Sequence, residues 1–206
     1  MEEYSPDHWY VHDNRVYNYY RESGMQFNGS FNVIENNEIY KVSDQLDTPY
    51  GCQLLNLLGN NNIVRGNTFS RMGSGANCLG LMFEWDLADV NLIENNTFRD
   101  VPVAISIQGG DGNIIRNNYF EAAVSDARAG IVIASYDDRS DWPCNEPDSI
   151  SPPDNPDHPE YGYYYPHDCH SKNNKVIGNT FVGFETDWIM QPVTMESNIF
   201  SDNSSR

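Results

Sequence analysis

The sequence has few basic residues. Its 206 residues include 12 lysines and arginines against 30 aspartates and glutamates, which gives a formal net charge of −18. Nucleic acids and anionic membrane surfaces are bound through positively charged faces. The charge balance therefore predicts no nucleic-acid partner, and it disfavours unaided binding of an acidic polysaccharide. Neutral glycans, cations and anionic glycans bridged by calcium are compatible with it.

Long apolar runs are absent as well. No stretch approaches the roughly 18 apolar residues of a membrane-spanning helix, so no membrane insertion is predicted. The N-terminal segment lacks the basic and apolar regions of a signal peptide. The length suits one domain that covers residues 1–206.

Cysteine is scarce, and its spacing excludes common cysteine motifs. No two of Cys52, Cys78, Cys144 and Cys169 form a CxxC pair, so a zinc or thioredoxin-type motif is not expected. Whether each cysteine forms a disulfide, is buried or is a free thiol is therefore inferred from its position relative to the repeated segments of the chain.

The chain is rich in asparagine, which recurs in a repeated segment. Seven copies align on one asparagine: WYVHDNRV (9–16), NVIENNEI (32–39), NIVRGNTF (62–69), NLIENNTF (91–98), NIIRNNYF (113–120), NKVIGNTF (174–181) and VTMESNIF (193–200). Each copy has an aliphatic position, the shared asparagine and a bulky apolar position. The residue before the asparagine is mostly Asp, Asn or Gly, which tolerate a left-handed backbone. Each copy is therefore predicted to form a strand, a tight turn and a second strand.

The alignment yields three columns. The aliphatic column is Val11, Ile34, Val64, Ile93, Ile115, Val176 and Met195. The asparagine column is Asn14, Asn37, Asn67, Asn96, Asn118, Asn179 and Asn198. The bulky column is Val16, Ile39, Phe69, Phe98, Phe120, Phe181 and Phe200. Because a side-chain amide can bond the same residue one turn away, the asparagine column is interpreted as a structural ladder and not as a binding surface.

A second motif begins with a small residue and alternates inward and outward positions. Its copies are GMQF (24–27), GCQL (51–54), GLMF (80–83), AISI (104–107) and GIVI (130–133). Period-two alternation is typical of a strand. The pattern predicts that Met25, Cys52, Leu81, Ile105 and Ile131 stack in one inward column. A second inward column would hold Phe27, Leu54, Phe83, Ile107 and Ile133.

Repeats of this length cannot bury their apolar faces alone and must stack. The two motifs resemble the right-handed parallel β-helix, or pectin lyase-like, superfamily, which includes pectate lyases, polygalacturonases, alginate lyases, epimerases and phage tailspikes. The resemblance covers nearly the whole chain and implies an all-β fold, a right-handed parallel β-helix of about seven turns with one long inserted loop.

The inserted loop covers residues 137–172, where the step between asparagine positions grows to 61 residues. A loop of this length in a solenoid is usually functional or disordered. Cys144 and Cys169 enclose most of it, so a disulfide between them is predicted, with an oxidising, extracellular or cell-surface setting. Cys52 falls in the inward column and is interpreted as a small buried hydrophobe. A Cys52–Cys78 bridge is disfavoured because Cys78 does not occupy the matching position.

The resemblance implies that a substrate lies along one outer face of the β-helix. Candidate substrate-binding residues follow the second motif or lie in the loop: Gln26, Gln53, Trp85, Gln108, Tyr136, Tyr163, Tyr164 and Tyr165. Asn28 is a further candidate on the same face. Candidate catalytic residues are acids and bases on the same face: Glu84, Asp86, Asp137, Asp138, Arg139 and His167.

Two reactions are compatible with these residues. An inverting hydrolase would pair Glu84 or Asp86 with Asp137 or Asp138, about 9.6 Å apart across two turns. The Gly-His-Gly and Arg-x-Lys signatures of polygalacturonases are missing. A lyase or epimerase would use Arg139, the tyrosines or His167 as base. It would need a cation, and calcium bound by Asp137, Asp138 and Asp141 is the cofactor that these oxygen ligands favour.

A non-catalytic role is the alternative. The chain opens inside a repeat, with Trp9 and Val11 already in register, and an uncapped end of stacked strands favours association. The sequence therefore predicts either a fragment of a longer protein or an end that another chain covers, and self-association through exposed ends is one form of such covering. The leading hypothesis is an extracellular carbohydrate-active β-helix that acts on or binds a polysaccharide. The alternative is a structural or adhesive β-helix.

Overall fold

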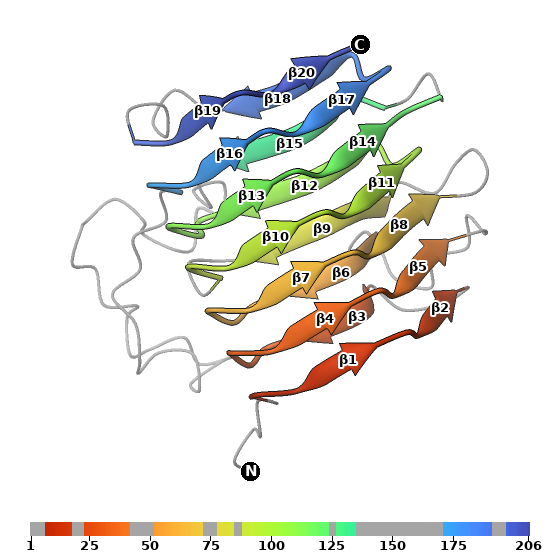
Figure 1. The fold of residues 1–206 in the computed structure, drawn as a ribbon, viewed down its shortest axis with the longest axis vertical. Helices are drawn as coiled ribbons and strands as arrows, with labels where there is room; N and C mark the ends of the chain where they lie inside the picture. Colours follow the sequence, from red (N-terminus) through yellow and green to blue (C-terminus); the bar gives the residue numbers. More distant parts are fainter. Residues whose placement is uncertain are drawn as a thin grey trace, which may run out of the picture.

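The chain winds into a solenoid whose turns stack three parallel sheets (Figure 1). The computed structural model describes residues 7–17, 23–41, 52–71, 78–84, 88–123, 127–134, 171–190 and 197–206. Figure 1 shows the first two sheets side by side along the front and the third behind them, with the N-terminal turn at one end and the C-terminal turn at the other. Every paired strand runs parallel to its neighbours.

The strands repeat in chain order through the three sheets. Sheet A contains β1 Tyr10–His12, β4 Val33–Glu35, β7 Ile63–Arg65, β10 Leu92–Glu94, β13 Ile114–Arg116, β16 Lys175–Ile177 and β19 Ile199–Ser201. Sheet B contains β2 Arg15–Tyr17, β5 Glu38–Lys41, β8 Thr68–Arg71, β11 Thr97–Arg99, β14 Tyr119–Glu121, β17 Thr180–Val182 and β20 Ser204–Ser205. Sheet C contains β3 Ser23–Phe27, β6 Cys52–Leu57, β9 Cys78–Glu84, β12 Val103–Gln108, β15 Ala129–Ala134 and β18 Thr186–Met190.

This architecture confirms the predicted all-β parallel β-helix. Sheets A and B hold seven strands each and sheet C holds six. The described residues contain no helix, and among them none forms a helical segment long and apolar enough to cross a membrane.

The core consists of inward columns from all three sheets. Sheet A contributes aliphatic side chains such as Ile93, and sheet B contributes phenylalanines. The rings of Phe69, Phe98 and Phe120 stack with centroids 4.7 and 5.0 Å apart, and Phe181 continues the stack 4.7 Å beyond Phe120. Each of these side chains is buried. The small residue that opens the second motif makes room for this stack, because a Cβ at Gly80 would lie 2.9 Å from Phe98 Cδ1.

The asparagine column is a hydrogen-bonded ladder, as predicted. Asn96 shows the repeating pattern: its Oδ1 accepts from the backbone N–H of Asn67, and its Nδ2 donates to the Val64 carbonyl. The residue before each asparagine turns the chain with a left-handed backbone, with φ of +55° at Asn36 and +56° at Asn95. The ladder satisfies the backbone of the corner between sheets A and B.

A second asparagine ladder precedes sheet A and was not predicted. It joins Asn32, Asn62, Asn91, Asn113, Asn174 and Asn198 through backbone N–H to Oδ1 bonds of 2.7–2.9 Å. Five of its members open a repeated segment, so the signal was present in the first letter of those five copies. Stacked asparagine side chains therefore fix the corner that leads into sheet A and the corner that leads into sheet B.

The seventh copy of the repeat was placed wrongly by five residues. Phe200 pairs with Val176 and so stands in the aliphatic column, not in the bulky one. Asn203, not Asn198, continues the ladder from Asn179. The left-handed corner is correspondingly at Asp202 and not at Ser197. The predicted position of Met195 lies outside the described residues.

The register predicted for the second strand motif was wrong at one copy. Leu55 and Leu57, not Cys52 and Leu54, stand level with Met25 and Phe27. Leu54 is buried in the core, but in the neighbouring position. The shift of three residues moves Cys52 to the start of β6, level with Cys78 at the start of β9.

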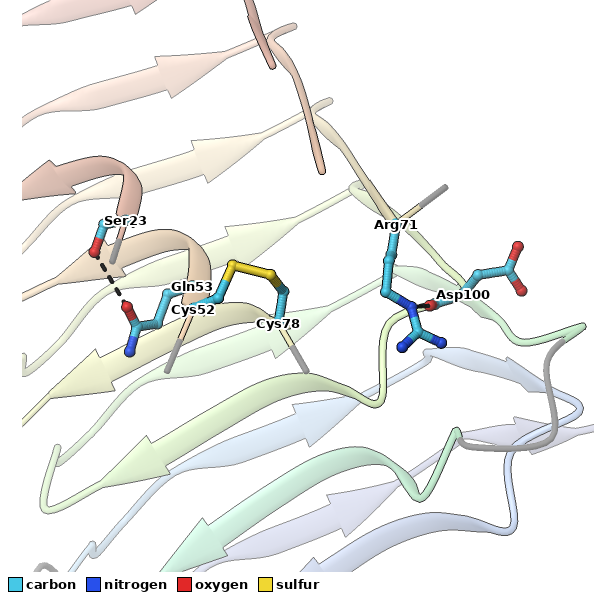
Figure 2. The surroundings of a disulfide bond; sticks show 6 residues. All are labelled: Ser23, Cys52, Gln53, Arg71, Cys78 and Asp100. Atoms are coloured by element: carbon cyan, nitrogen blue, oxygen red, sulfur yellow. Dashed lines mark hydrogen bonds between the residues drawn. A yellow bond between two sulfur atoms is a disulfide. The ribbon is translucent and has the colours of Figure 1, made fainter. Parts of the chain in front are cut away.

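The disfavoured Cys52–Cys78 bridge exists. The two residues form a disulfide with a sequence separation of 26 and Cα atoms 4.3 Å apart. Figure 2 shows it joining adjacent strands of sheet C. In the same region Arg71, at the end of β8, donates from Nε to the Asp100 carbonyl at 2.8 Å. Cys52 is buried as expected, but it is not a free thiol. Cys144, Cys169 and residues 137–170 of the inserted loop lie outside the described residues, so their pairing and the domain prediction stay predictions.

Removing the Cys52–Cys78 bridge is expected to lower stability by roughly 3.5 kcal/mol, because the bridge closes a loop of this length in the unfolded chain. The double variant Cys52→Ala with Cys78→Ala should melt about 10 °C below the wild type. Circular dichroism under oxidising conditions measures the shift. The double variant Cys144→Ala with Cys169→Ala tests the other predicted pair separately. A Cys52–Cys78 variant that melts within about 2 °C of the wild type would contradict the prediction.

Candidate functional site

The outer face of sheet C carries a row of polar side chains. Between the buried positions of its strands, the outward positions hold Gln26, Asn56, Met82 and Ser106 in register. Two residues further along, Glu84 stands level with Gln108. The polar members come from β3, β6, β9 and β12, which are four adjacent strands. They cover about 14 Å along the solenoid.

The centre of the row is a contact between Asn56 and Glu84. The Asn56 Nδ2 donates to Glu84 Oε2 at 2.6 Å. Asn56 is 2% exposed, and its Oδ1 is a buried acceptor with no hydrogen-bond partner. A buried acceptor without a donor is rare and disfavours the folded state. The Asn56 side-chain carbonyl can therefore still accept a hydrogen bond from an O–H or N–H donor.

The ends of the row are amides with local partners. The exposed Gln26 donates from Nε2 to Asn28 Oδ1 at 3.0 Å. On β12, Gln108 Nε2 lies 3.4 Å from the Ser106 hydroxyl. The structure thus brings together three of the predicted residues, namely Gln26, Glu84 and Gln108, on one face.

Gln53 lies apart from this row. It is buried at the start of β6, beside the disulfide, where it accepts a hydrogen bond from the Ser23 hydroxyl at 3.2 Å (Figure 2). Asn56 and Ser106 were missed by the sequence analysis. Asn56 would have been found if β6 had been aligned on Leu55 and Leu57, because the residue between two inward positions must point outward.

The remaining candidates lie outside the described residues. They are Trp85, Asp86, Tyr136, Asp137, Asp138, Arg139, Asp141, Tyr163, Tyr164, Tyr165 and His167. Their roles in catalysis, substrate binding or calcium binding stay predictions.

Within the part of the chain that the structure describes, no three His, Cys, Asp or Glu residues are grouped so that they could hold a metal ion. The two described histidines are engaged otherwise: His8 stacks on Phe31 at 5.2 Å, and His12 Nδ1 lies 2.8 Å from Asp13 Oδ2. Cys52 and Cys78 cannot act as thiolate ligands because they are joined to each other.

The arrangement on sheet C offers the exposed amide of Gln26 and the half-buried side chains of Glu84 and Gln108, whereas Asn56 and Ser106 are only 2% and 4% exposed. Amides, a hydroxyl and a carboxylate spaced at the strand repeat suit an extended, hydroxyl-rich ligand that crosses several turns. Glu84 accepts a hydrogen bond from Asn56, and the acids with which the hydrolase hypothesis pairs it, Asp137 and Asp138, lie outside the described residues.

Comparison with known proteins identifies a family to which this chain is similar. No curated protein and no solved structure is significantly similar to this chain. A family described as periplasmic copper-binding protein (NosD) matches residues 3–139, which is more than half of the sequence. The match and the parallel solenoid together are consistent with the right-handed parallel β-helix superfamily. The chain belongs to the NosD family.

Proposed function

We propose that this chain binds a polysaccharide along the outer face of sheet C, in a compartment outside the cytoplasm. The observation that carries the proposal is the pair of Asn56 and Glu84, with the unpartnered Asn56 Oδ1 in the middle of a polar row. A sugar hydroxyl is both a donor and an acceptor, so it can bond an amide carbonyl and a carboxylate at the same point. Gln26 and Gln108 extend this chemistry to either side.

The compartment is proposed from two observations. The family is described as periplasmic, and the Cys52–Cys78 disulfide fits an oxidising environment. The charge of −18 favours a neutral glycan, or an anionic one held through calcium. Hydrolysis, elimination and epimerisation are finer proposals on the same face, and all of them need acids or bases from outside the described residues.

The family description also names copper, and the described residues do not fit a copper centre. Copper(II) favours imidazole ligands and copper(I) favours thiolate or thioether ligands in groups. In the described ranges the histidines are separately engaged and the cysteines are bonded to each other. Copper therefore takes no part in the proposed binding.

Retention by polysaccharides tests the proposal. The wild type is expected to be retarded in native gels that contain at least one polysaccharide of a neutral and anionic panel, run with calcium or with EDTA. Glu84→Gln combined with Gln108→Ala should weaken that retention at least about tenfold, because a hydrogen bond to a charged group contributes roughly 1.5–3 kcal/mol. The calcium and EDTA runs separate direct binding from calcium-bridged binding.

Glu121→Gln is the matched control, because Glu121 is an exposed acid on sheet B whose partner is Arg99. It should leave retention unchanged. Melting temperatures of all variants are measured first, so that loss of fold is not scored as loss of binding. If the Glu84 and Gln108 variant were retained like the wild type, the binding surface would lie elsewhere. If no polysaccharide of the panel retarded the wild type, the proposal would be wrong.

A second candidate is assembly through the end turns. The outermost turns expose large apolar side chains, with Trp9 57% and Tyr10 59% exposed at one end, and Trp188 38% and Ile199 49% at the other. End-to-end contact would join two different surfaces and would therefore build open chains. The expected sign of this assembly is a mean particle mass that rises with protein concentration beyond the mass of a dimer.

A further inference from the structure

The outer face of sheet A has two columns of side chains with different chemistry. Both lie on strands β4, β7, β10 and β13, whose registers are fixed by their pairing. The first column is aliphatic and half-buried: Val33, Ile63, Leu92 and Ile114. The second column alternates in charge: Glu35, Arg65, Glu94 and Arg116.

The charged column consists of two ion pairs within the chain. Arg65 Nη2 lies 2.7 Å from Glu35 Oε2, and Arg116 Nη2 lies 2.7 Å from Glu94 Oε2. The hydrogen bonds from Arg65 hold the pKa of the Glu35 carboxyl below its ordinary value, so the acid is charged at neutral pH. Both arginine side chains remain nearly half exposed, at 45% and 46%. Each guanidinium can therefore bind a second carboxylate from outside.

Two apolar side chains beside these columns are held in a disfavoured backbone conformation. Phe31 has φ of +60° and is 53% exposed, and Val90 has φ of +55° and is 58% exposed. Other turns use Asn61, Gly112 or Asn173 at this corner, which is the expected choice for a left-handed residue. A β-branched residue there is an outlier that destabilises the chain by about 1–2 kcal/mol. Phe31 stacks on the exposed ring of His8, with centroids 5.2 Å apart. About half of the surface of Phe31 and of Val90 stays exposed, and an apolar surface of a partner could cover it.

We propose that sheet A is the interface of a homodimer, in which two copies pack face to face about a two-fold axis that runs along the strand direction. The order Glu, Arg, Glu, Arg is the reason. Reversing the stack of turns in the second copy places Glu35 opposite the partner's Arg116, and Arg65 opposite the partner's Glu94. The same rotation leaves the aliphatic column facing the aliphatic column. A single two-fold rotation therefore gives favourable contacts in both the charged column and the aliphatic column.

Other arrangements of the two copies fail on charge. Sliding one copy by a single turn sets Glu94 against the partner's Glu94, or Arg65 against the partner's Arg65, and like charges in contact cost several kcal/mol. A two-fold axis along the solenoid instead places the charged column against the aliphatic one, or like charges at the same level. The charge order therefore specifies both the direction and the register of the pair.

The shape of the corner agrees with this register. Phe31 comes opposite the partner's Gly112, which has no side chain. A Cβ at Gly112 would have Val90 Cγ2 as its nearest neighbour, at 3.6 Å, so the space above this corner is open. A phenyl ring from the partner could fill it and cover Val90. Beyond the four central turns, Tyr10 faces the partner's Lys175, again without a like-charge contact.

The expected interface is small. Six facing strands at about 4.8 Å, each contributing about five residues of 3.3 Å, outline about 500 Å² on each copy and about 1,000 Å² in all. This is near the lower limit for a specific interface. Self-association is therefore measured over a wide concentration range, by sedimentation equilibrium from about 1 to about 500 µM.

The decisive experiment mixes two charge variants. Arg65→Glu places two acids opposite each other in a homodimer, and Glu94→Arg places two arginines opposite each other. Each variant alone is expected to dimerise at least about tenfold more weakly than the wild type. In an equimolar mixture the two variants complement each other, so heterodimers should form with near wild-type affinity. Arg99→Glu, an exposed charge reversal on sheet B, is the matched control and should not change the dimer.

A second variant separates the interface from folding. Val90→Asn installs a residue that tolerates the left-handed corner and removes the exposed apolar group. The monomer should melt at or above the wild-type temperature, while the dimer weakens. A purely structural role of Val90 predicts the opposite change in melting temperature.

Three results would overturn the proposal. They are a wild type that stays monomeric through the whole concentration range, single charge variants that dimerise like the wild type, and a mixture that forms no heterodimer. Particles that grow beyond the dimer mass and ignore the sheet A variants would assign association to the end turns instead.

Discussion

Phe98→Ala is expected to lower the free energy of unfolding by about 5 kcal/mol. Truncating a buried phenylalanine to alanine typically costs 3–5 kcal/mol because it leaves a cavity. Phe98 is fully buried, and its ring is stacked on both sides, 4.7 Å from Phe69 and 5.0 Å from Phe120. Each aromatic pair adds about 0.5–1.5 kcal/mol beyond burial. A gap in the middle of the stack therefore affects three successive turns.

Urea unfolding followed by far-UV circular dichroism measures this loss. Phe98→Leu is the informative comparison, since it keeps most of the apolar volume but removes both ring contacts, and we expect it to lose less than half as much. Tyr119→Ala is the surface control, because this neighbouring side chain of sheet B is 37% exposed. A Phe98→Ala variant within about 1 kcal/mol of the wild type would show that adjacent turns collapse into the cavity.

The fold was predictable because each turn repeats the same pattern of core and corner residues. Aliphatic and aromatic positions such as Ile93 and Phe98 fill the core, and Asn95 supplies the left-handed corner between them. Asn96 then bonds the turns on either side. A signal that recurs in every turn survives variation in the length of the connections, and it identifies a parallel β-helix without any single copy being distinctive.

Register was not predictable from the local motif. The segment Cys52–Leu57 contains two overlapping alternations, one through Cys52 and Leu54 and one through Leu55 and Leu57. Only the contact with Leu81 and Phe83 of the next turn decides between them. Because the alternation through Cys52 and Leu54 was chosen, Asn56 was not recognised as an outward residue, and Cys52 was not aligned with Cys78. The seventh copy failed in the same way, because Asn198 and Asn203 both precede residues of a strand.

The candidate site was harder to predict than the fold for a physical reason. Core and corner positions repeat because stacking demands it, whereas outer-face positions are free to vary from turn to turn. Glu84 and Gln108 were found because they follow the second motif directly. Asn56 carries the strongest sign of a ligand, an unpartnered buried acceptor, and no sequence pattern reports an unmet hydrogen bond.

Asn96→Ala is expected to destabilise the chain by about 4 kcal/mol, since it removes buried hydrogen bonds to two neighbouring turns. The Asn96 Oδ1 accepts from the backbone and side-chain N–H groups of Asn67 at 2.9 and 3.0 Å. Its Nδ2 donates to the Val64 carbonyl at 2.9 Å and, in the next turn, to Asn118 Oδ1 at 3.1 Å. Each buried group left without its partner costs about 1–3 kcal/mol. The backbone N–H of Asn67 loses the side-chain acceptor that holds the corner, so the loss is structural and not confined to the mutated side chain.

The same substitution at the end of the ladder is the matched control. Asn14 is exposed, and its side chain donates to Asn37 and His12. Asn14→Ala should therefore cost less than about 1 kcal/mol. If the two alanine variants unfolded at the same urea concentration, stacking of amides would not be what stabilises the ladder.

Asn96→Asp isolates the donor half of the side chain. The new carboxyl keeps an acceptor for Asn67, but its second oxygen faces the Val64 carbonyl and Asn118 Oδ1, which are both acceptors. Only the protonated acid can donate there, so folding raises the pKa of the introduced carboxyl above its unfolded value of about 3.9. A group whose pKa is raised by folding contributes its stability below the unfolded pKa and loses it as pH rises. The variant should therefore be closest to the wild type near pH 4 and fall away toward pH 7, whereas a ladder that needed only acceptors would give the two proteins parallel pH profiles.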